Sequence, residues 1–139
     1  MYSTFIHATD LSQNHYAMCE EAKKIADKFN AQLYLMHVIE PPATLQLAQS
    51  LGFAEFDMPR REDAISVMQV IADSLNIPNE QIIVEVGSIK THILNKIKEL
   101  QCDMVILGKH SPDALHHILG STAHAVSQHA PCHVLTLHP

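Results

Sequence analysis

The strongest constraint on the fold is a repeated alternation of strand-like and helix-like segments along the chain. Short runs of β-branched, aromatic and aliphatic residues predict strands. Between them, apolar residues recur at spacings of three and four, which is typical of helices with one buried face. Five such alternations predict an α/β fold with an open, five-stranded parallel sheet, helices on both faces and right-handed crossovers. The expected strands are residues 2–9, 33–39, 81–86, 103–107 and 134–137.

The helices between these strands are less evenly defined. Ser12 is the expected N-cap of the first helix, because serine side chains accept hydrogen bonds from the first turn. Residues 43–58 follow a strand that ends at a Pro-Pro pair, and they predict an irregular stretch with a short helix around residues 45–48. The other expected helices cover residues 18–29 with an end near Asn30, the segment from Pro59 to Asn76, residues 89–100, and a last segment that opens at Gly120.

Length and composition narrow the class of protein. The chain has 139 residues, of which 47% are hydrophobic, so we expect one domain over residues 1–139 with a substantial core. No stretch reaches the roughly 18 consecutive apolar residues of a membrane span. The first residues lack the basic start and cleavage site of a secretory signal, which predicts a soluble, cytoplasmic protein.

The charge argues against a nucleic-acid-binding protein, and the cysteine pattern argues against a disulfide-linked or zinc-binding one. Nine basic against fifteen acidic residues give a net charge of −6, and no basic cluster offsets it, so nucleic acid is not an expected partner. Cys19, Cys102 and Cys132 are odd in number and show no CxxC spacing. We expect them to be small buried hydrophobic residues rather than a disulfide framework or a zinc site.

The sharpest local signal lies in the last third of the chain. The hydrophobic run at residues 104–107 stops at Gly108, and twelve residues later Gly120 begins a segment that reads as a helix start. A strand, a glycine turn and a helix N-terminus form the arrangement that α/β proteins use to hold phosphates. Because ligands of open parallel sheets bind beyond the carboxyl ends of the strands, we also expect contributions from residues that follow the other strands. These candidates are Thr9, Asp10, Val38, Ile39 and Gly87.

Several short motifs resemble those of one known family over nearly the full length of the chain. Each is weak alone, but their order and spacing are specific. They resemble the universal stress proteins, and the chain is identified as a UspA-like member. The resemblance implies a Rossmann-like fold of the adenine nucleotide alpha hydrolase type. The motifs are ATDLS at residues 8–12, LMHVI at 35–39, VEVG at 84–87, VILGKH at 105–110, ILGS at 118–121 and HAPCHVL at 129–135.

The resemblance also implies a test for ATP binding. Members that bind ATP resemble one another in having two glycines three apart, nine intervening residues, and then Gly-Ser or Gly-Thr. Here Gly108 and Gly120 fit this pattern, but Ser111 stands at the second glycine and eight residues separate it from Gly120. Serine adopts the backbone conformations of glycine less easily. We still favour retained binding, because some binding members are similar in having a shortened loop with a polar residue and a proline.

If ATP binds, the resemblance implies a role for each candidate. Asp10 lies against the adenine or ribose, and Val38 against the adenine. The helix start at Gly120 takes the phosphates through its N–H groups, with Mg²⁺ as a possible companion. The expected binding residues are Ala8, Thr9, Asp10, Val38, Leu107, Gly108, Ser111, Gly120, Ser121 and Thr122.

Simpler interpretations compete at Asp10, at the start of the last helix and at Gly87. From the residues alone, Asp10 is better explained as a cap of the first helix. Ser121 or Thr122 could equally be the N-cap of the last helix. Gly87 fits a tight turn better than a ligand contact.

The histidines and nucleophiles do not add a second site. Seven of the eleven histidines fall in the last thirty residues, but no metal-ligand spacing is evident and no metal site is expected. We expect His37, inside a strand, to be a hydrogen-bonded core group. No catalytic pair or Walker motif is present. Any activity would be a weak ATPase or autophosphorylation on Ser111, Ser121 or Thr122.

Three functions remain open at this point. The first is a cytoplasmic homodimer that binds ATP and reports nucleotide state during stress. The resemblance implies that such dimers pair through the final strand, here residues 132–137. The second is a dimeric interaction protein whose degenerate site binds no nucleotide, and the third is the weak enzyme.

Overall fold

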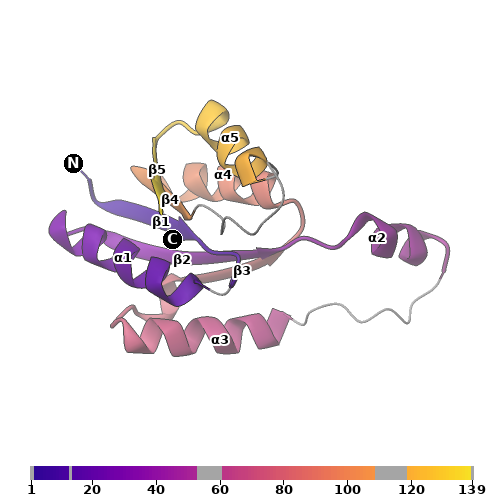
Figure 1. Ribbon diagram of the computed structural model, residues 1–139, viewed down its shortest axis with the longest axis horizontal. Helices are drawn as coiled ribbons and strands as arrows, with labels where there is room; N and C mark the ends of the chain where they lie inside the picture. Colours follow the sequence, from indigo (N-terminus) through magenta and orange to yellow (C-terminus); the bar gives the residue numbers. More distant parts are fainter. Residues whose placement is uncertain (1, 13, 53–60, 109–118, 139) are drawn as a thin grey trace.

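The computed structural model describes residues 2–12, 14–52, 61–108 and 119–138. Within them, five parallel strands form one sheet in the order β3-β2-β1-β4-β5 (Figure 1). The expected open, parallel α/β sheet is therefore confirmed. The strands are β1 (Thr4–Ala8), β2 (Gln32–Ile39), β3 (Ile82–Val86), β4 (Met104–Gly108) and β5 (His133–Leu137), and the helices are α1 (His15–Lys28), α2 (Ala43–Ser50), α3 (Arg61–Ser74), α4 (Ile89–Leu100), α5 (Leu119–His129) and the 3₁₀ turn η1 (Asn79–Gln81).

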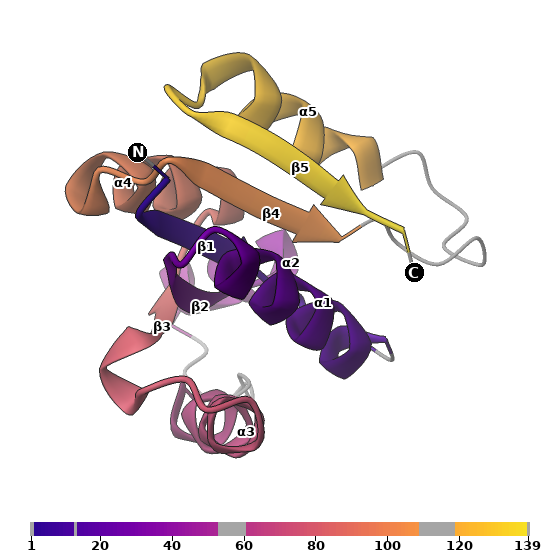
Figure 2. The ribbon, with the colours of Figure 1, turned by 90° about the vertical axis from the view of Figure 1, so that its left-hand side faces the viewer.

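Helices cover both faces of the sheet, so the strands are buried on two sides. Helices α1 and α3 pack on one face in a cluster that includes Phe5, Leu35 and Ile106. Helices α4 and α5 pack on the other face around Ile6 and Val105. In Figure 2, α4 and α5 lie in the upper half of the view and α1 and α3 in the lower half. This double covering explains why the strands are nearly continuous apolar runs rather than alternating ones.

The strand order places one crevice at the centre of the molecule. From β1 the chain proceeds through β2 to β3 on one side, and then returns to the other side of β1 for β4 and β5. The connections after β1 and β4 therefore diverge to opposite faces. This divergence is the topological switch point, beyond whose strand ends open α/β sheets hold their ligands.

Most element boundaries differ from the sequence expectation by one to three residues, and a few of these differences concern local structure. Helix α1 begins at His15, and its N-cap Asn14 makes no side-chain hydrogen bond, so the expected Ser12 cap is wrong. Helix α2 spans Ala43–Ser50, longer than the short helix expected there, and it lies apart from the sheet and the other helices (Figure 1). Strand β3 starts one residue late because η1 precedes it. Pro59, expected in the first turn of α3, lies outside the described residues.

No described helix has the length and apolar character that crossing a membrane requires.

A buried histidine stands at the centre of the sheet. His7 on β1 is 1% exposed, and its Nδ1–H donates to the Ile106 carbonyl oxygen on β4 at 2.9 Å. Its Nε2 has no hydrogen-bond partner among the described residues. Burial lowers the pKa of His7 from 6.5 to about 4, although the bond to Ile106 and the charge of Asp10 act in the opposite direction. The imidazole is therefore neutral in the folded protein at neutral pH.

We expect His7 to make the protein sensitive to acid. Between pH 6.5 and about 4 the unfolded chain binds a proton at this site more readily than the folded one. The free energy of unfolding is thus fully retained above pH 6.5 and falls as the pH drops through this window, by about 3 kcal/mol at pH 4. Urea unfolding at several pH values checks this. The loss of unfolding free energy between pH 7 and 4 should shrink in His7→Leu and persist in His124→Leu, which removes an exposed histidine. Equal losses in both variants would show that His7 is not the source of the acid sensitivity.

Candidate functional site

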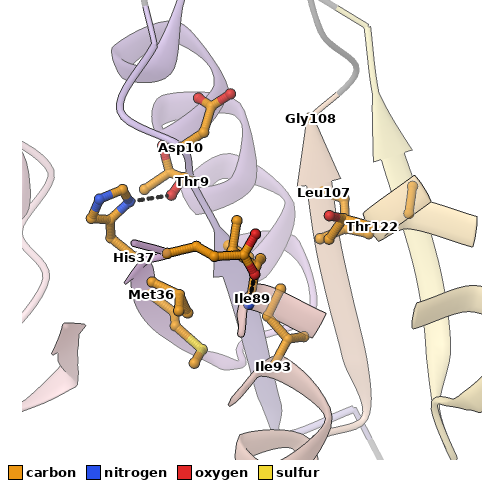
Figure 3. Close-up of a pocket in the computed structure, with 13 residues that line it drawn as sticks. Thr9, Asp10, Met36, His37, Ile89, Ile93, Leu107, Gly108 and Thr122 are labelled. Atoms are coloured by element: carbon orange, nitrogen blue, oxygen red, sulfur yellow. Dashed lines mark hydrogen bonds between the residues drawn. The ribbon is translucent and has the colours of Figure 1, made fainter. Parts of the chain in front are cut away.

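A cavity of about 350 Å³ lies at the switch point (Figure 3). Strands β1, β2 and β4 contribute their carboxyl ends, and α4 and α5 contribute their first turns. Its walls are mostly aliphatic, with a few polar groups at the mouth of β1 and β2. The lining residues are Ala8, Thr9, Asp10, Met36, His37, Val38, Glu40, Ile89, Ile93, Leu107, Gly108, Thr122 and Ala123.

The structure brings most of the expected site residues together. Seven of the ten, drawn from β1, β2, β4 and α5, line the same cavity although they are spread over more than a hundred positions of the chain. Ser111 lies outside the described residues. Gly120 and Ser121 fall in the first turn of α5. Because α5 begins at Leu119, neither Ser121 nor Thr122 is its N-cap, and that interpretation is wrong. The ligand roles of all ten stay predictions.

The turn after β1 is held by its own side chains and by β2. Thr9 Oγ1 accepts from the Leu11 N–H at 3.1 Å, and Asp10 Oδ1 accepts from the Ser12 N–H at 2.9 Å. Leu11 takes the left-handed conformation that this turn requires, with φ of 57°. Asp10 therefore closes a local turn and does not cap α1, which begins only at His15. Its exposed side chain remains at the edge of the cavity.

His37 ties this turn to the neighbouring strand. The Thr9 N–H donates to the Met36 carbonyl at 2.8 Å, and the Thr9 carbonyl accepts from His37 Nδ1 at 2.8 Å (Figure 3). Since a carbonyl oxygen only accepts, Nδ1 carries the proton. The expected hydrogen bond of His37 is confirmed, but its ring is half-buried in the cavity wall and is not part of the core. Both polar backbone atoms of Thr9 are thus fixed by β2.

Glu40 is a lining residue that the sequence did not indicate. Its Oε1 accepts from the Ile89 N–H, at the first turn of α4, at 3.0 Å. A carboxylate at a helix N-terminus offsets the partial positive charge of the unpaired N–H groups there. In the sequence Glu40 precedes two prolines and is 49 residues away from Ile89, so no local pattern connects them.

The described lining carries two carboxylates and no lysine or arginine. Asp10 and Glu40 are the acidic groups, and the N-terminus of α4 is already satisfied in part by Glu40. The N-terminus of α5, where Thr122 lies, is the other helix start at the cavity. An anionic ligand group would be favoured there by the backbone N–H groups rather than by a cationic side chain of the described lining.

Two glycines near the strand ends serve packing. A Cβ on Gly108 would collide with Sδ of Met18, which packs over β4 from α1. A Cβ on Gly87 would meet the His92 ring, and its φ of 148° disfavours other residues. Gly87 does not line the cavity, and its N–H donates to the Ile39 carbonyl at 2.9 Å, as expected for a tight turn.

We expect Gly108→Ala to destabilise the protein because the added methyl group displaces Met18. Because the obstructing atoms are the flexible end of Met18, we expect a loss of unfolding free energy at the low end of the overpacking range, about 1 kcal/mol. In a Met18→Ala background the same substitution should cost less than about 0.5 kcal/mol, since the obstructing side chain is gone. Urea unfolding of the wild type, the two single variants and the double variant measures the coupling free energy between Gly108 and Met18. An equal cost in both backgrounds would show that Met18 is not the reason for glycine at this position.

Among the described residues, no group of three or more histidine, cysteine, aspartate or glutamate side chains is arranged to hold a metal ion.

Comparison with known proteins identifies the family. The model of the universal stress protein family matches residues 1–138. The chain belongs to this family. Universal stress protein A homolog 2 of Coxiella burnetii is 36% identical over 122 residues, which cover 86% of this chain and 83% of the relative. Universal stress protein G of Escherichia coli O157:H7 is 28% identical over 144 residues, 99% of each chain.

Solved structures of universal stress proteins share the fold. The universal stress protein UspA from Lactobacillus plantarum superimposes with a TM-score of 0.73 at 24% identity, and covers 98% of this chain and 97% of its own. A universal stress protein solved in complex with cAMP gives a TM-score of 0.68 at 20% identity, with 99% and 97% covered. At these identities the likeness extends to the sheet and its helices, and each binding site has to be argued from the residues of its own chain.

Proposed function

We propose that this universal stress protein binds ATP in the cavity at the switch point and acts in the cytoplasm as a homodimeric sensor or regulator of the stress response. The observation that carries the proposal is the convergence of β1, β2, β4, α4 and α5 on one aliphatic cavity with a few polar groups at its edge. A relative of the same fold is known in complex with cAMP. That complex supports an adenine nucleotide as the ligand class.

The size and chemistry of the cavity fit the nucleoside part of the ligand. Its volume of about 350 Å³ is near the lower end of about 300–1,000 Å³ for small-molecule pockets. An adenine ring needs flat apolar walls, which Val38, Ile89 and Leu107 supply. Ribose hydroxyls need acceptors, and the Asp10 carboxylate at the edge is suited to them. The fixed Thr9 turn holds that carboxylate in place.

The phosphates would extend from the cavity toward α5. Gly120, Ser121 and Thr122 lie in its first turn, where unpaired backbone N–H groups favour anions. Because Asp10 and Glu40 are both acidic, phosphates close to them would be repelled. This directs the triphosphate to the α5 side of the cavity. A Mg²⁺ ion would be held mainly by the phosphates, as is usual for this ion.

Titration calorimetry with ATP and Mg²⁺ tests the proposal. We expect measurable binding by the wild-type protein and about tenfold weaker binding by Thr122→Val, which removes one hydroxyl at the cavity with little change in shape. Thr91→Val is a matched control, because Thr91 is also in the first turn of a helix but does not line the cavity. Its affinity should not change. No heat with millimolar ATP would instead leave the protein as a dimeric interaction module with a vestigial site.

The dimer part of the proposal concerns the open edge of β5. This strand pairs only with β4 in the described sheet, and an unpaired strand edge is a template for another chain. The His133 N–H donates inward to the Asp103 carbonyl at 3.2 Å. By alternation along the strand, the N–H groups of Val134 and Thr136 are directed at the open edge.

We therefore expect Thr136→Pro to weaken the dimer while the fold is kept. Proline removes an outward N–H that β4 does not use. Leu135→Pro is the comparison, since it removes an inward hydrogen bond and should destabilise the monomer itself. Sedimentation velocity gives the oligomeric state, and circular dichroism gives the fold. A wild-type protein that sediments as a monomer at tens of micromolar would refute pairing through β5.

A further inference from the structure

Two cysteines that are far apart in the sequence are neighbours at the amino-terminal ends of β4 and β5. Cys102 comes two residues before β4, and Cys132 comes one residue before β5. The strands are in register with Met104 opposite His133. The backbone pairing of the two strands begins at the residues that follow the cysteines, where the His133 N–H donates to the Asp103 carbonyl. Extension of this register by one pair puts Cys132 opposite Asp103, one residue from Cys102.

This placement is compatible with a disulfide. Neighbouring strands lie about 4.8 Å apart and successive residues about 3.3 Å, so these spacings give a Cα separation of about 6 Å, within the range of disulfides. Because Cys102 precedes β4, the alternation of faces along that strand does not fix the side of its thiol. Both side chains belong to the apolar cluster beneath α4 and α5, together with Val105 and Val126. The two sulfur atoms are therefore on the same face of the sheet, and both cysteines are free thiols in this structure.

The two thiols interact and differ in acidity. The adjacent Cys132 thiol, together with burial, raises the pKa of the Cys102 thiol. The one S–H of Cys102 donates to the Met104 carbonyl at 2.9 Å, which acts in the opposite direction. The adjacent Cys102 thiol and a backbone contact with Val105 lower the pKa of Cys132, although burial and the charge of Asp103 act against them. Cys132 is also the more exposed of the two. It is thus the thiol that reaches the thiolate form first.

We propose that Cys102 and Cys132 are a redox pair that a hydroperoxide oxidises to an intramolecular disulfide. The Cys132 thiolate attacks the terminal peroxide oxygen, the O–O bond breaks, and the alkoxide or hydroxide leaves with a proton from solvent. Cys132 is then a sulfenic acid. The Cys102 thiol attacks the Cys132 sulfur, loses its proton, and expels water as the S–S bond forms. Overall two thiols and one hydroperoxide give one disulfide, one alcohol (or water for H₂O₂) and one water.

Cys19 supplies an internal control because its surroundings are the opposite. It lies on α1, in the cluster on the other face of the sheet, and is fully buried. Burial raises its pKa to about 12, although a hydrogen bond with Thr9 lowers it somewhat. It should remain reduced when the pair is oxidised.

The pair is separate from the cavity. The cysteines lie at the amino-terminal ends of the strands, whereas the cavity is at the carboxyl ends. A disulfide would close a loop that contains β4 and α5 and so fasten β5 to β4. It is a modification that can be tested whether or not ATP binds.

Thiol counting in the full-length protein tests the proposal. The reduced protein is treated with H₂O₂, denatured, alkylated with iodoacetamide and analysed by non-reducing peptide mass mapping. We expect alkylation at one cysteine, Cys19, instead of all three, a linked peptide pair containing Cys102 and Cys132, and reversal by dithiothreitol. Three alkylated cysteines after oxidation, a link through Cys19, or a link between two chains would overturn the proposal.

Substitutions then assign the two roles. Cys102→Ser should accumulate the sulfenic acid at Cys132, which dimedone traps. Cys132→Ser should react with H₂O₂ at least about tenfold more slowly than wild type, because the more acidic thiol is missing. Cys19→Ser should form the disulfide at the wild-type rate. Equal dimedone labelling of Cys102→Ser and Cys132→Ser would show that Cys132 is not the attacking thiol. The peptide map of the wild-type protein needs no substitution, so it tests the disulfide even if a variant fails to fold.

Discussion

The candidate site depends on the way the turn after β1 is fastened to β2. Thr9 uses both of its polar backbone atoms in this connection, with its N–H on the Met36 carbonyl and its carbonyl on His37 Nδ1. Because β1 is the central strand, anything fixed to its carboxyl end is fixed relative to the whole sheet. The turn places Asp10 at the cavity edge without using it as a helix cap. A binding group held in this way loses little conformational freedom when a ligand arrives.

The charge around the cavity depends on the two helices whose N-termini lie there. Two parallel helices start at the cavity, but their N-termini are not equivalent. Glu40 accepts from the first turn of α4, so that helix end is already neutralised in part, whereas the first turn of α5 contains the Gly-Ser-Thr segment. Helix ends attract anions only as far as their N–H groups are unpaired. Glu40 therefore makes the α4 end the less favourable of the two for an anionic ligand group.

The two ends of the sheet have different chemistry. At the carboxyl ends, the connections after β1 and β4 lead to opposite faces, and the cavity there has carboxylates and a histidine in its wall. At the amino ends of β4 and β5, Cys102 and Cys132 lie together in an apolar layer. Parallel strands make this possible, because all their equivalent ends lie on one side. Ligand binding and thiol oxidation can therefore occur in one small chain without competing for the same residues.

The sequence by itself determined the architecture, because buried parallel strands must be continuous apolar runs and the helices between them must carry one apolar stripe. It also indicated the strand ends and, through the family resemblance, ten site residues, of which seven line the cavity. Only the tertiary structure decided that Asp10 closes a turn, that Gly108 makes room for Met18, and that Glu40 meets α4. It alone showed the buried His7 and the adjacent Cys102 and Cys132. Apart from the local Asp10 turn, these features join residues between 30 and about 100 positions apart. No local spacing encodes which segments become neighbours once the strand order reverses at β1.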